Sequence, residues 1–208
     1  MKGVYLVTDR SLLAGRSLDE VVVQAIKGGV SCVQLREKDM STRGFIEEAH
    51  HIKHLLTPYN IPLLINDRVD VALAVEADGV HIGQEDMPYP LARKMLGEHA
   101  IIGLSVETVE QVQEAEEYDV DYLGVSAIFA TPTKTDTKHI WGIQGLRHIK
   151  NISRHPLVAI GGINALNAAE VVRAGADSIA VVSAICAVPD PRKAAEELSR
   201  MYNKEQRA

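Results

Sequence analysis

The chain contains eight short runs of almost uninterrupted apolar residues, and each run is followed by a longer segment with the spacing of a surface helix. A strand that is apolar at nearly every position is buried on both faces, which is typical of a parallel sheet covered by helices. The predicted strands are Val4–Thr8, Cys32–Arg36, Pro62–Asn66, Gly79–Ile82, Ile101–Ser105, Tyr122–Ser126, Leu157–Gly161 and Ser178–Val182. The predicted helices are Leu18–Lys27, Thr42–Leu56, Arg68–Glu76, Pro90–Leu96, Val109–Tyr118, Gly142–Ile149, Ala165–Ala174 and Arg192–Met201.

Eight strand–helix units in a chain of 208 residues leave about 26 residues for each unit. This is sufficient for a small (β/α)8 TIM barrel, which needs about 200 residues. We therefore expect a single barrel domain over residues 1–208, because no residues remain for a second domain. A doubly wound open sheet is the alternative, because short strands do not by themselves show that a sheet closes.

The charge balance limits the partners that the chain can bind. Lys and Arg number 22 against 28 Asp and Glu, for a formal net charge of −6. No general basic field exists to attract nucleic acid or an anionic membrane, so we expect small-molecule partners. The longest apolar stretch, residues 179–188, is about half the length of a membrane span. We expect no nucleic acid partner and no membrane partner, and the sequence leaves open whether the chain forms a homo-oligomer.

The two cysteines, Cys32 and Cys186, both lie within apolar runs. This placement predicts buried free thiols rather than a disulfide or a metal site. Residues 1–10 lack the apolar core and cleavage site of a signal peptide. The expected location is the cytoplasm.

Polar residues alternate where the second predicted strand ends. Gln34, Arg36 and Lys38 are two residues apart, so an extended backbone places all three on one face. Inward-facing cations are costly without an anion, which suggests a polyanionic ligand such as a diphosphate. The alternative is an internal ion pair with Asp67 or another acid.

Two carboxylates, Asp67 and Asp86, follow the ends of adjacent predicted strands. Carboxylates shared with phosphate oxygens are a suitable environment for Mg²⁺, so we expect a magnesium site here. Helix capping is the alternative for Asp67, because it directly precedes a predicted helix. Glu85 is the substitute for Asp86 if Asp86 faces solvent.

The loops after the last three predicted strands carry residues suited to binding phosphate. Residues 129–137 carry several hydroxyl groups around Lys134, which predicts a lid or clamp, with a solvated loop as the alternative. Gly161-Gly162 and Ser183 lie near helix starts after the last two strands, where barrels bind phosphate, although a plain turn would also use a glycine.

The histidines are assigned no chemistry. His81 lies within a predicted strand, so we expect a hydrogen-bonded core residue rather than an acid or a base. His50, His51 and His54 share a predicted helix with several charged residues, so a solvated face is expected rather than a metal site.

Several of these segments resemble the thiamin phosphate synthase family, in order and with suitable spacing. The matching segments are Tyr5-Leu6-Val7-Thr8-Asp9, Gln34-Leu35-Arg36-Glu37-Lys38, Ile65-Asn66-Asp67, residues 79–86, Thr131-Pro132-Thr133-Lys134 and residues 159–163. The resemblance runs from Tyr5 to about Ile185. It implies a (β/α)8 transferase of thiamine biosynthesis that joins hydroxymethylpyrimidine diphosphate to a thiazole phosphate with Mg²⁺ and releases diphosphate.

The resemblance also implies roles for individual residues. Gln34 and Ser105 would lie at the pyrimidine, and Asp67 and Asp86 would bind magnesium. The diphosphate would be met by Arg36, Lys38, Asn66 and Lys134, among which Arg36, Lys38 and Lys134 are the expected catalytic residues. The thiazole phosphate side would be lined by Thr131, Thr133, Gly162, Val182 and Ser183. The chain departs from the family pattern at Glu107 and at Ser126-Ala127.

Three other functions remain open at this point. A thiazole tautomerase would share the barrel and the thiazole phosphate site, but it would not need the cations and carboxylates of a diphosphate site. A Schiff-base aldolase would use Lys38 or Lys134 as its nucleophile. A non-catalytic regulator would bind phosphate without turnover.

Overall fold

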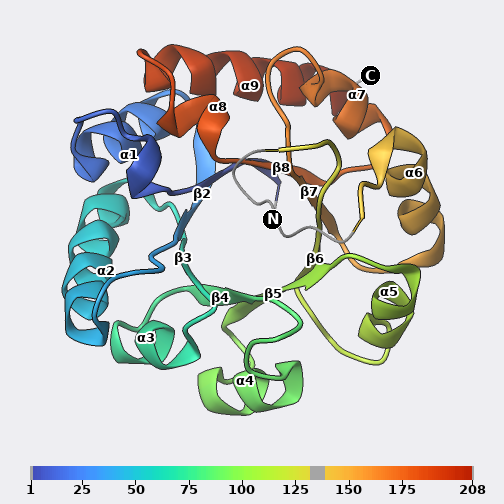
Figure 1. Cartoon of the computed structure of the whole chain (residues 1–208), viewed down its shortest axis with the longest axis horizontal. Coiled ribbons are helices and arrows are strands. Elements are labelled where there is room, and N and C mark those ends of the chain that lie inside the picture. Colours follow the sequence, from blue (N-terminus) through green and yellow to red (C-terminus); the bar gives the residue numbers. More distant parts are fainter. Residues whose placement is uncertain (1, 132–138, 208) are drawn as a thin grey trace.

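Eight parallel strands close into a barrel in the computed structural model, which describes residues 2–131 and 139–207. The strands are β1 Gly3–Val7, β2 Val30–Leu35, β3 Leu63–Asn66, β4 Gly79–Ile82, β5 Ile101–Val106, β6 Tyr122–Val125, β7 Leu157–Ile160 and β8 Ser178–Val181. They follow one another around the barrel in chain order, and the helices form an outer ring (Figure 1). Pairing of β1 with β8 confirms the predicted TIM barrel and excludes the open sheet.

Each predicted helix is present in the described residues, with ends that differ by a few positions. The helices are α1 Leu18–Lys27, α2 Thr42–Leu56, α3 Val69–Ala74, α4 Tyr89–Leu96, α5 Val109–Ala115, α6 Gly142–Ile152, α7 Ala168–Arg173, α8 Ser183–Cys186 and α9 Pro191–Glu205, with short 3-10 turns η1 Arg10–Leu12 and η2 Thr57–Tyr59. Helix α3 is shorter than predicted, because Asp67 and Glu76 on either side adopt left-handed backbone angles (φ 61° and 50°). Helix α8 was not predicted, because four residues are too few to show a helical period.

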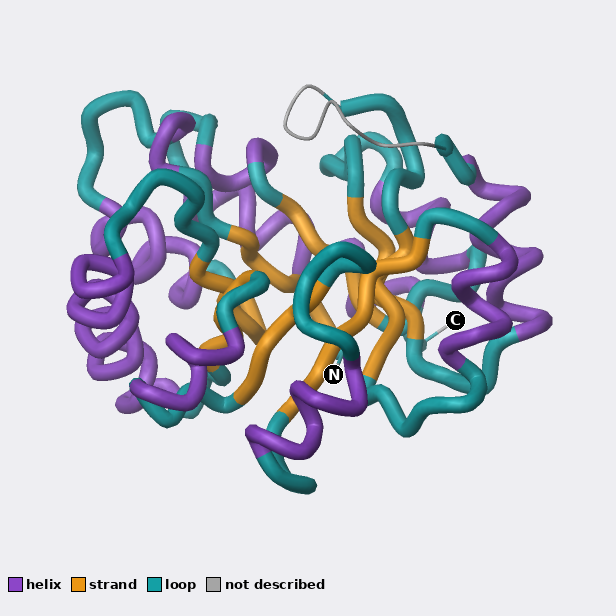
Figure 2. The backbone as a smooth tube through the Cα atoms, turned by 60° about the horizontal axis from the view of Figure 1, so that its bottom comes forward, coloured by secondary structure: helices purple, strands orange, loops and turns teal. Residues whose placement is uncertain are grey.

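Two apolar layers hold the barrel together. The larger one lies between the sheet and the helices. Figure 2 shows the backbone of the strands with the helices around them. The smaller one fills the barrel interior and consists of Tyr5, Val7, Cys32, Leu64, Tyr122, Val158 and Ala180. Every second residue of a strand points into the barrel. Cys32 points inward, so Gln34, two residues further along β2, lies on the inner side as well.

The cysteine and membrane predictions can be compared with this fold. Cys32 and Cys186 are both buried and free, as predicted. Burial raises the pKa of the Cys186 thiol to about 11, so this thiol is protonated at neutral pH. Among the described residues, no helix combines the length and the apolar character that a bilayer span requires.

Candidate active site

A cavity of about 750 Å³ opens at the carboxyl ends of the strands, where TIM barrels place their active sites. Its lining includes most of the site residues predicted from the sequence: Gln34, Arg36, Lys38, Asn66, Asp67, Asp86, Ser105, Thr131, Gly162, Val182 and Ser183. Glu107 and Ser126, two of the positions that depart from the family pattern, line it as well. Thr133 and Lys134, with most of the predicted clamp segment, lie outside the described residues.

The two described cations of the cavity have acidic partners in the ligand-free protein. Lys38 Nζ lies 2.5 Å from Asp67 Oδ2, and Arg36 Nη1 lies 3.5 Å from Asp9 Oδ2. The internal ion pairs considered as an alternative are therefore present. Both basic side chains remain partly exposed to the cavity, at 52% and 28%. An anionic ligand can reach them while these acids hold their positions.

The two carboxylates predicted as a magnesium pair lie against each other. Asp86 Oδ2 accepts a hydrogen bond of 2.7 Å from the Gly83 backbone N–H. Burial raises the pKa of Asp86, and the neighbouring Asp67 carboxylate raises it further. The N-cap of α3 is Arg68 rather than Asp67, so the capping alternative for Asp67 is wrong. Two adjacent carboxylates repel each other, and a divalent cation would relieve that repulsion.

The turn after β7 brings backbone close to the cavity. Gly161 and Gly162 adopt left-handed angles of 101° and 66°, which other residues rarely tolerate. A Cβ on Gly162 would lie 2.8 Å from the Ala130 carbonyl oxygen, so only glycine fits this approach to the loop after β6. Asn167 Nδ2 donates a hydrogen bond of 2.9 Å to the Gly162 carbonyl oxygen. Ser183 follows the neighbouring strand β8 and lies at the start of α8.

A chain of hydrogen bonds that the sequence does not predict crosses the cavity floor. Gln34 Nε2 donates to Tyr5 Oη, Tyr5 Oη lies 3.0 Å from Tyr122 Oη, and Tyr122 Oη lies 2.9 Å from His81 Nδ1. His81 Nε2 in turn lies 2.8 Å from Ser105 Oγ. His81 is hydrogen-bonded, as expected, but it lines the cavity instead of belonging only to the core. The two tyrosines could have been suspected, because a phenol on an apolar strand requires a polar partner.

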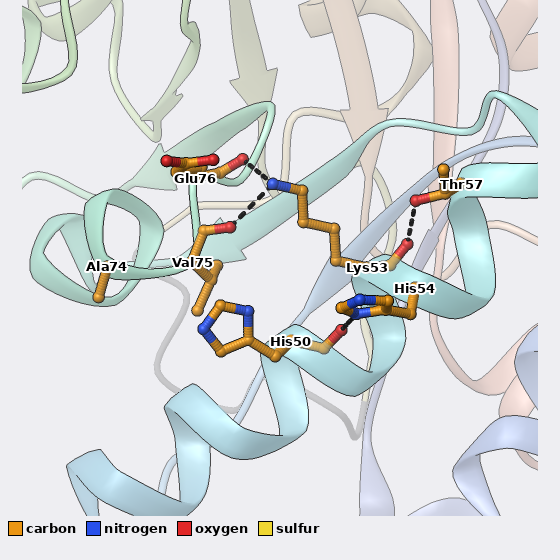
Figure 3. A pocket seen from close by; sticks show the side chains of 7 residues that line it. All are labelled: His50, Lys53, His54, Thr57, Ala74, Val75 and Glu76. Carbon is orange, nitrogen blue, oxygen red and sulfur yellow. Dashed lines mark hydrogen bonds between the residues drawn. The ribbon is translucent and has the colours of Figure 1, made fainter.

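A second hollow of about 380 Å³ lies at the ends of α2 and α3, away from the strand ends (Figure 3). Lys53 Nζ donates to the carbonyl oxygens of Val75 and Glu76 at 2.9 and 2.6 Å, so its charge caps the end of α3. His50 and His54 are exposed here, and His51 pairs with Asp19, which agrees with the expected solvated face. Among residues 2–131 and 139–207, no group of three His, Cys, Asp or Glu side chains could hold a metal ion.

Known proteins share this fold and these motifs. A thiamine-phosphate synthase from Albidiferax ferrireducens is 57% identical over 200 residues, which are 96% of this chain and 91% of that protein. One from Leptospira biflexa is 53% identical over 206 residues, with 97% and 98% covered. The solved thiamine phosphate pyrophosphorylase of Pyrococcus furiosus superposes with a TM-score of 0.89 at 41% identity and covers 98% of this chain and 96% of its own.

More distant structures share the fold alone. An orotidine 5'-phosphate decarboxylase from Pyrococcus horikoshii superposes with a TM-score of 0.69 at 17% identity, covering 96% of this chain and 99% of its own. The thiamine monophosphate synthase family model matches residues 4–185, which span all eight strands except the first residue of β1. The predicted family, transferase class and barrel are confirmed. Since the family model matches residues 4–185 and a relative 57% identical covers 96% of the chain, the chain belongs to the thiamine monophosphate synthase family.

Proposed function

We propose that the cavity joins hydroxymethylpyrimidine diphosphate to a thiazole phosphate, giving thiamin phosphate and diphosphate. A carbon–nitrogen bond forms between the thiazole ring nitrogen and the methylene carbon of the pyrimidine. The carbon–oxygen bond to diphosphate breaks, and its electron pair leaves with the diphosphate. One observation carries this proposal: a single cavity gathers two cations, a carboxylate pair and a glycine turn, as two phosphate-bearing substrates require.

The diphosphate end of the cavity is formed by Arg36, Lys38 and Asn66, with Lys134 as a further expected contact. Asn66 ends β3 and is 8% exposed, so its amide is held by the strand at the cavity wall. Negative charge grows on the diphosphate as the carbon–oxygen bond breaks. Cations fixed before the reaction stabilise that charge without having to reorganise, which lowers the barrier in a dissociative substitution.

Asp67 and Asp86 would hold Mg²⁺ at this end, and their paired carboxylates fit a hard divalent cation. The ion would neutralise part of the diphosphate charge when bound. The Lys38 ammonium group lies against Asp67, so it would be a second cation beside the proposed Mg²⁺. Asp67 therefore positions Lys38 next to the leaving group.

The other end of the cavity would hold the thiazole phosphate. Gly162, Val182 and Ser183 line this side with Thr131, and Thr133 is expected there as well. Gln34 and Ser105 lie on the floor, where the pyrimidine would bind. The thiazole nitrogen already carries a lone pair, so the reaction requires no general base. Cytoplasmic location and homo-oligomerisation stay predictions.

Diphosphate release measured with both substrates, with and without Mg²⁺, tests the proposal. Release that needs both substrates is expected. A thiazole tautomerase would act on the thiazole phosphate alone, and an aldolase would leave a covalent adduct after borohydride treatment with a carbonyl substrate. A phosphate-binding regulator would bind both substrates and release no diphosphate, and each of these three results would contradict the proposal.

Ser183→Asp is expected to weaken the thiazole phosphate more than the pyrimidine diphosphate. A carboxylate at the start of α8 would repel the phosphate dianion across a few ångströms. Michaelis constants for both substrates measure the difference. Ala187→Asp is the matched control, because it adds the same charge to an exposed position just after α8 that does not line the cavity. Equal weakening of both substrates by Ser183→Asp would contradict this division of the cavity.

A further inference from the structure

The hydrogen-bond chain on the cavity floor is buried and has a single direction. Tyr5 is 1% exposed, and its hydroxyl lies between the Gln34 amide nitrogen and Tyr122 Oη. The amide N–H donates to Tyr5, so the remaining partner for the Tyr5 hydrogen is Tyr122 Oη. A buried hydroxyl hydrogen without an acceptor is costly, which fixes Tyr5 as the donor to Tyr122.

The donor and acceptor of the next two hydrogen bonds, from Tyr122 to His81 and from His81 to Ser105, follow in the same way. Tyr122 is fully buried, accepts from Tyr5 and therefore donates to His81 Nδ1. With Nδ1 as the acceptor, a neutral His81 carries its hydrogen on Nε2 and donates it to Ser105 Oγ. Ser105 then has its own hydroxyl hydrogen left to donate. Burial raises the pKa of both phenols well above the ordinary value, so both keep their hydrogens at neutral pH.

Two glycines make room for this chain. His81, Gly103 and Tyr122 lie side by side on β4, β5 and β6 in one row of the sheet register. The Tyr122 phenol passes over Gly103 to reach His81, and a Cβ on Gly103 would collide with the phenol. A Cβ on Gly124 would lie 2.7 Å from His81 Cε1. The rings of His81 and Tyr122 stack with centroids 5.5 Å apart, so the packing favours this one arrangement.

We propose that Tyr5 and Tyr122 are positioning residues that relay the orientation of the Gln34 amide to His81 and so keep Ser105 as a hydrogen-bond donor toward the bound heterocycle. The Ser105 hydrogen then needs an acceptor on the ligand, such as a ring nitrogen with a free lone pair. A heterocycle that presents an N–H at this point would leave the Ser105 hydrogen without that acceptor and should bind more weakly. This last step rests on the proposed function, because it takes the pyrimidine as the heterocycle.

The tautomer of His81 in the ligand-free protein tests the relay directly. Nitrogen NMR of ¹⁵N-histidine-labelled protein distinguishes the two tautomers, and a His81→Asn variant assigns the signal. We expect the Nε2–H form in the wild type. Tyr5→Phe and Gln34→Met leave Tyr122 at Nδ1 and Ser105 at Nε2 in place, yet each should raise the ratio of the Nδ1–H form to the Nε2–H form about fivefold. Tyr202→Phe is the matched control, because it removes a buried phenol hydroxyl, bonded to the Asp177 carbonyl, at the outer surface of the barrel.

Kinetics give a second, separate readout. In Tyr5→Phe we expect the Michaelis constant for the pyrimidine diphosphate to rise about fivefold, while that for the thiazole phosphate stays unchanged. An Nδ1–H tautomer in the wild type, or an unchanged tautomer ratio in both Tyr5→Phe and Gln34→Met, would overturn the relay. Diphosphate release without these tautomer changes would leave the proposed function standing and refute the relay alone. The tautomer changes in a protein that releases no diphosphate would support the relay and refute the proposed function.

Discussion

Asp86→Asn is expected to raise the Mg²⁺ concentration for half-maximal activity by about 10- to 100-fold. Excess chelator should abolish turnover of the wild type. Asn keeps an oxygen that can accept the Gly83 N–H, so the loop after β4 should retain its geometry. What the variant loses is one negative charge beside Asp67. A titration of turnover against Mg²⁺ concentration measures the shift.

This variant also separates a metal site from a structural carboxylate pair. Removing one of two like charges relieves repulsion, so the thermal stability of Asp86→Asn without metal should equal or exceed that of the wild type. Asp67→Asn should raise the Mg²⁺ requirement as well, but it also removes the partner of Lys38. Asp70→Asn is the matched control, since Asp70 follows on α3 and pairs with Arg68 at the surface. Full activity of both Asp67→Asn and Asp86→Asn in excess chelator would refute the magnesium site.

The barrel was predictable because parallel strands that are buried on both faces appear in the sequence as almost uninterrupted apolar runs. Runs such as Val4–Thr8 are apolar at nearly every position, and helices α1 and α2 begin at Leu18 and Thr42 as predicted, where Ser17 and Ser41 cap them. The mouth of the cavity was predictable for a related reason. The carboxyl ends of parallel strands meet, so Arg36, Asn66 and Asp86 could be grouped before their distances were known.

The floor of the cavity could not be predicted in the same way. Tyr5 and Tyr122 lie 117 positions apart, and their contact depends on how far the strands shift relative to one another around the barrel. Gly103 shows no left-handed angle, and its role is to leave space for a side chain from the next strand. Local sequence carries no information on either point. For this reason the sequence predicts a core position for His81, although it predicts the strand of His81 correctly.

The acidic partners of the cations were also only partly predictable. The sequence indicates Asp67 as an ion-pair partner for the basic residues after β2, and Lys38 does pair with it. No sequence pattern indicates Asp9 as the partner of Arg36. It belongs to β1's loop, and its carboxylate is held by the Ser11 backbone N–H at 3.0 Å. Because Asp9 is held in this way, it helps to orient the Arg36 side chain. Replacing Arg36 should therefore lower the rate strongly.

Arg36→Ala is expected to lower turnover roughly a hundredfold, because one fixed charge contact to a developing anion contributes on the order of 3 kcal/mol to the barrier. The backbone N–H of Arg36 donates to Thr8 Oγ1 at 3.0 Å and survives the change, so the strand end should keep its course. Arg36→Lys should recover part of the rate, since an ammonium restores the charge but not the planar pair of donors. Steady-state kinetics with both substrates measure turnover separately from the Michaelis constants.

Arg10→Ala is the matched control for this prediction, because Arg10 lies near the same cavity mouth and also pairs with carboxylates. Its guanidinium lies 2.6 Å from both Glu37 and Glu48, and it does not line the cavity. Arg10→Ala should lose stability, because it leaves the Glu37 side chain, which is only 8% exposed, without this partner, but it should lose no turnover. If Arg36→Ala behaved like Arg10→Ala, the Arg36–Asp9 pair would serve only to join β1 and β2. The leaving diphosphate would then depend on Lys38, Asn66, Lys134 and the Mg²⁺ that the carboxylate pair would hold.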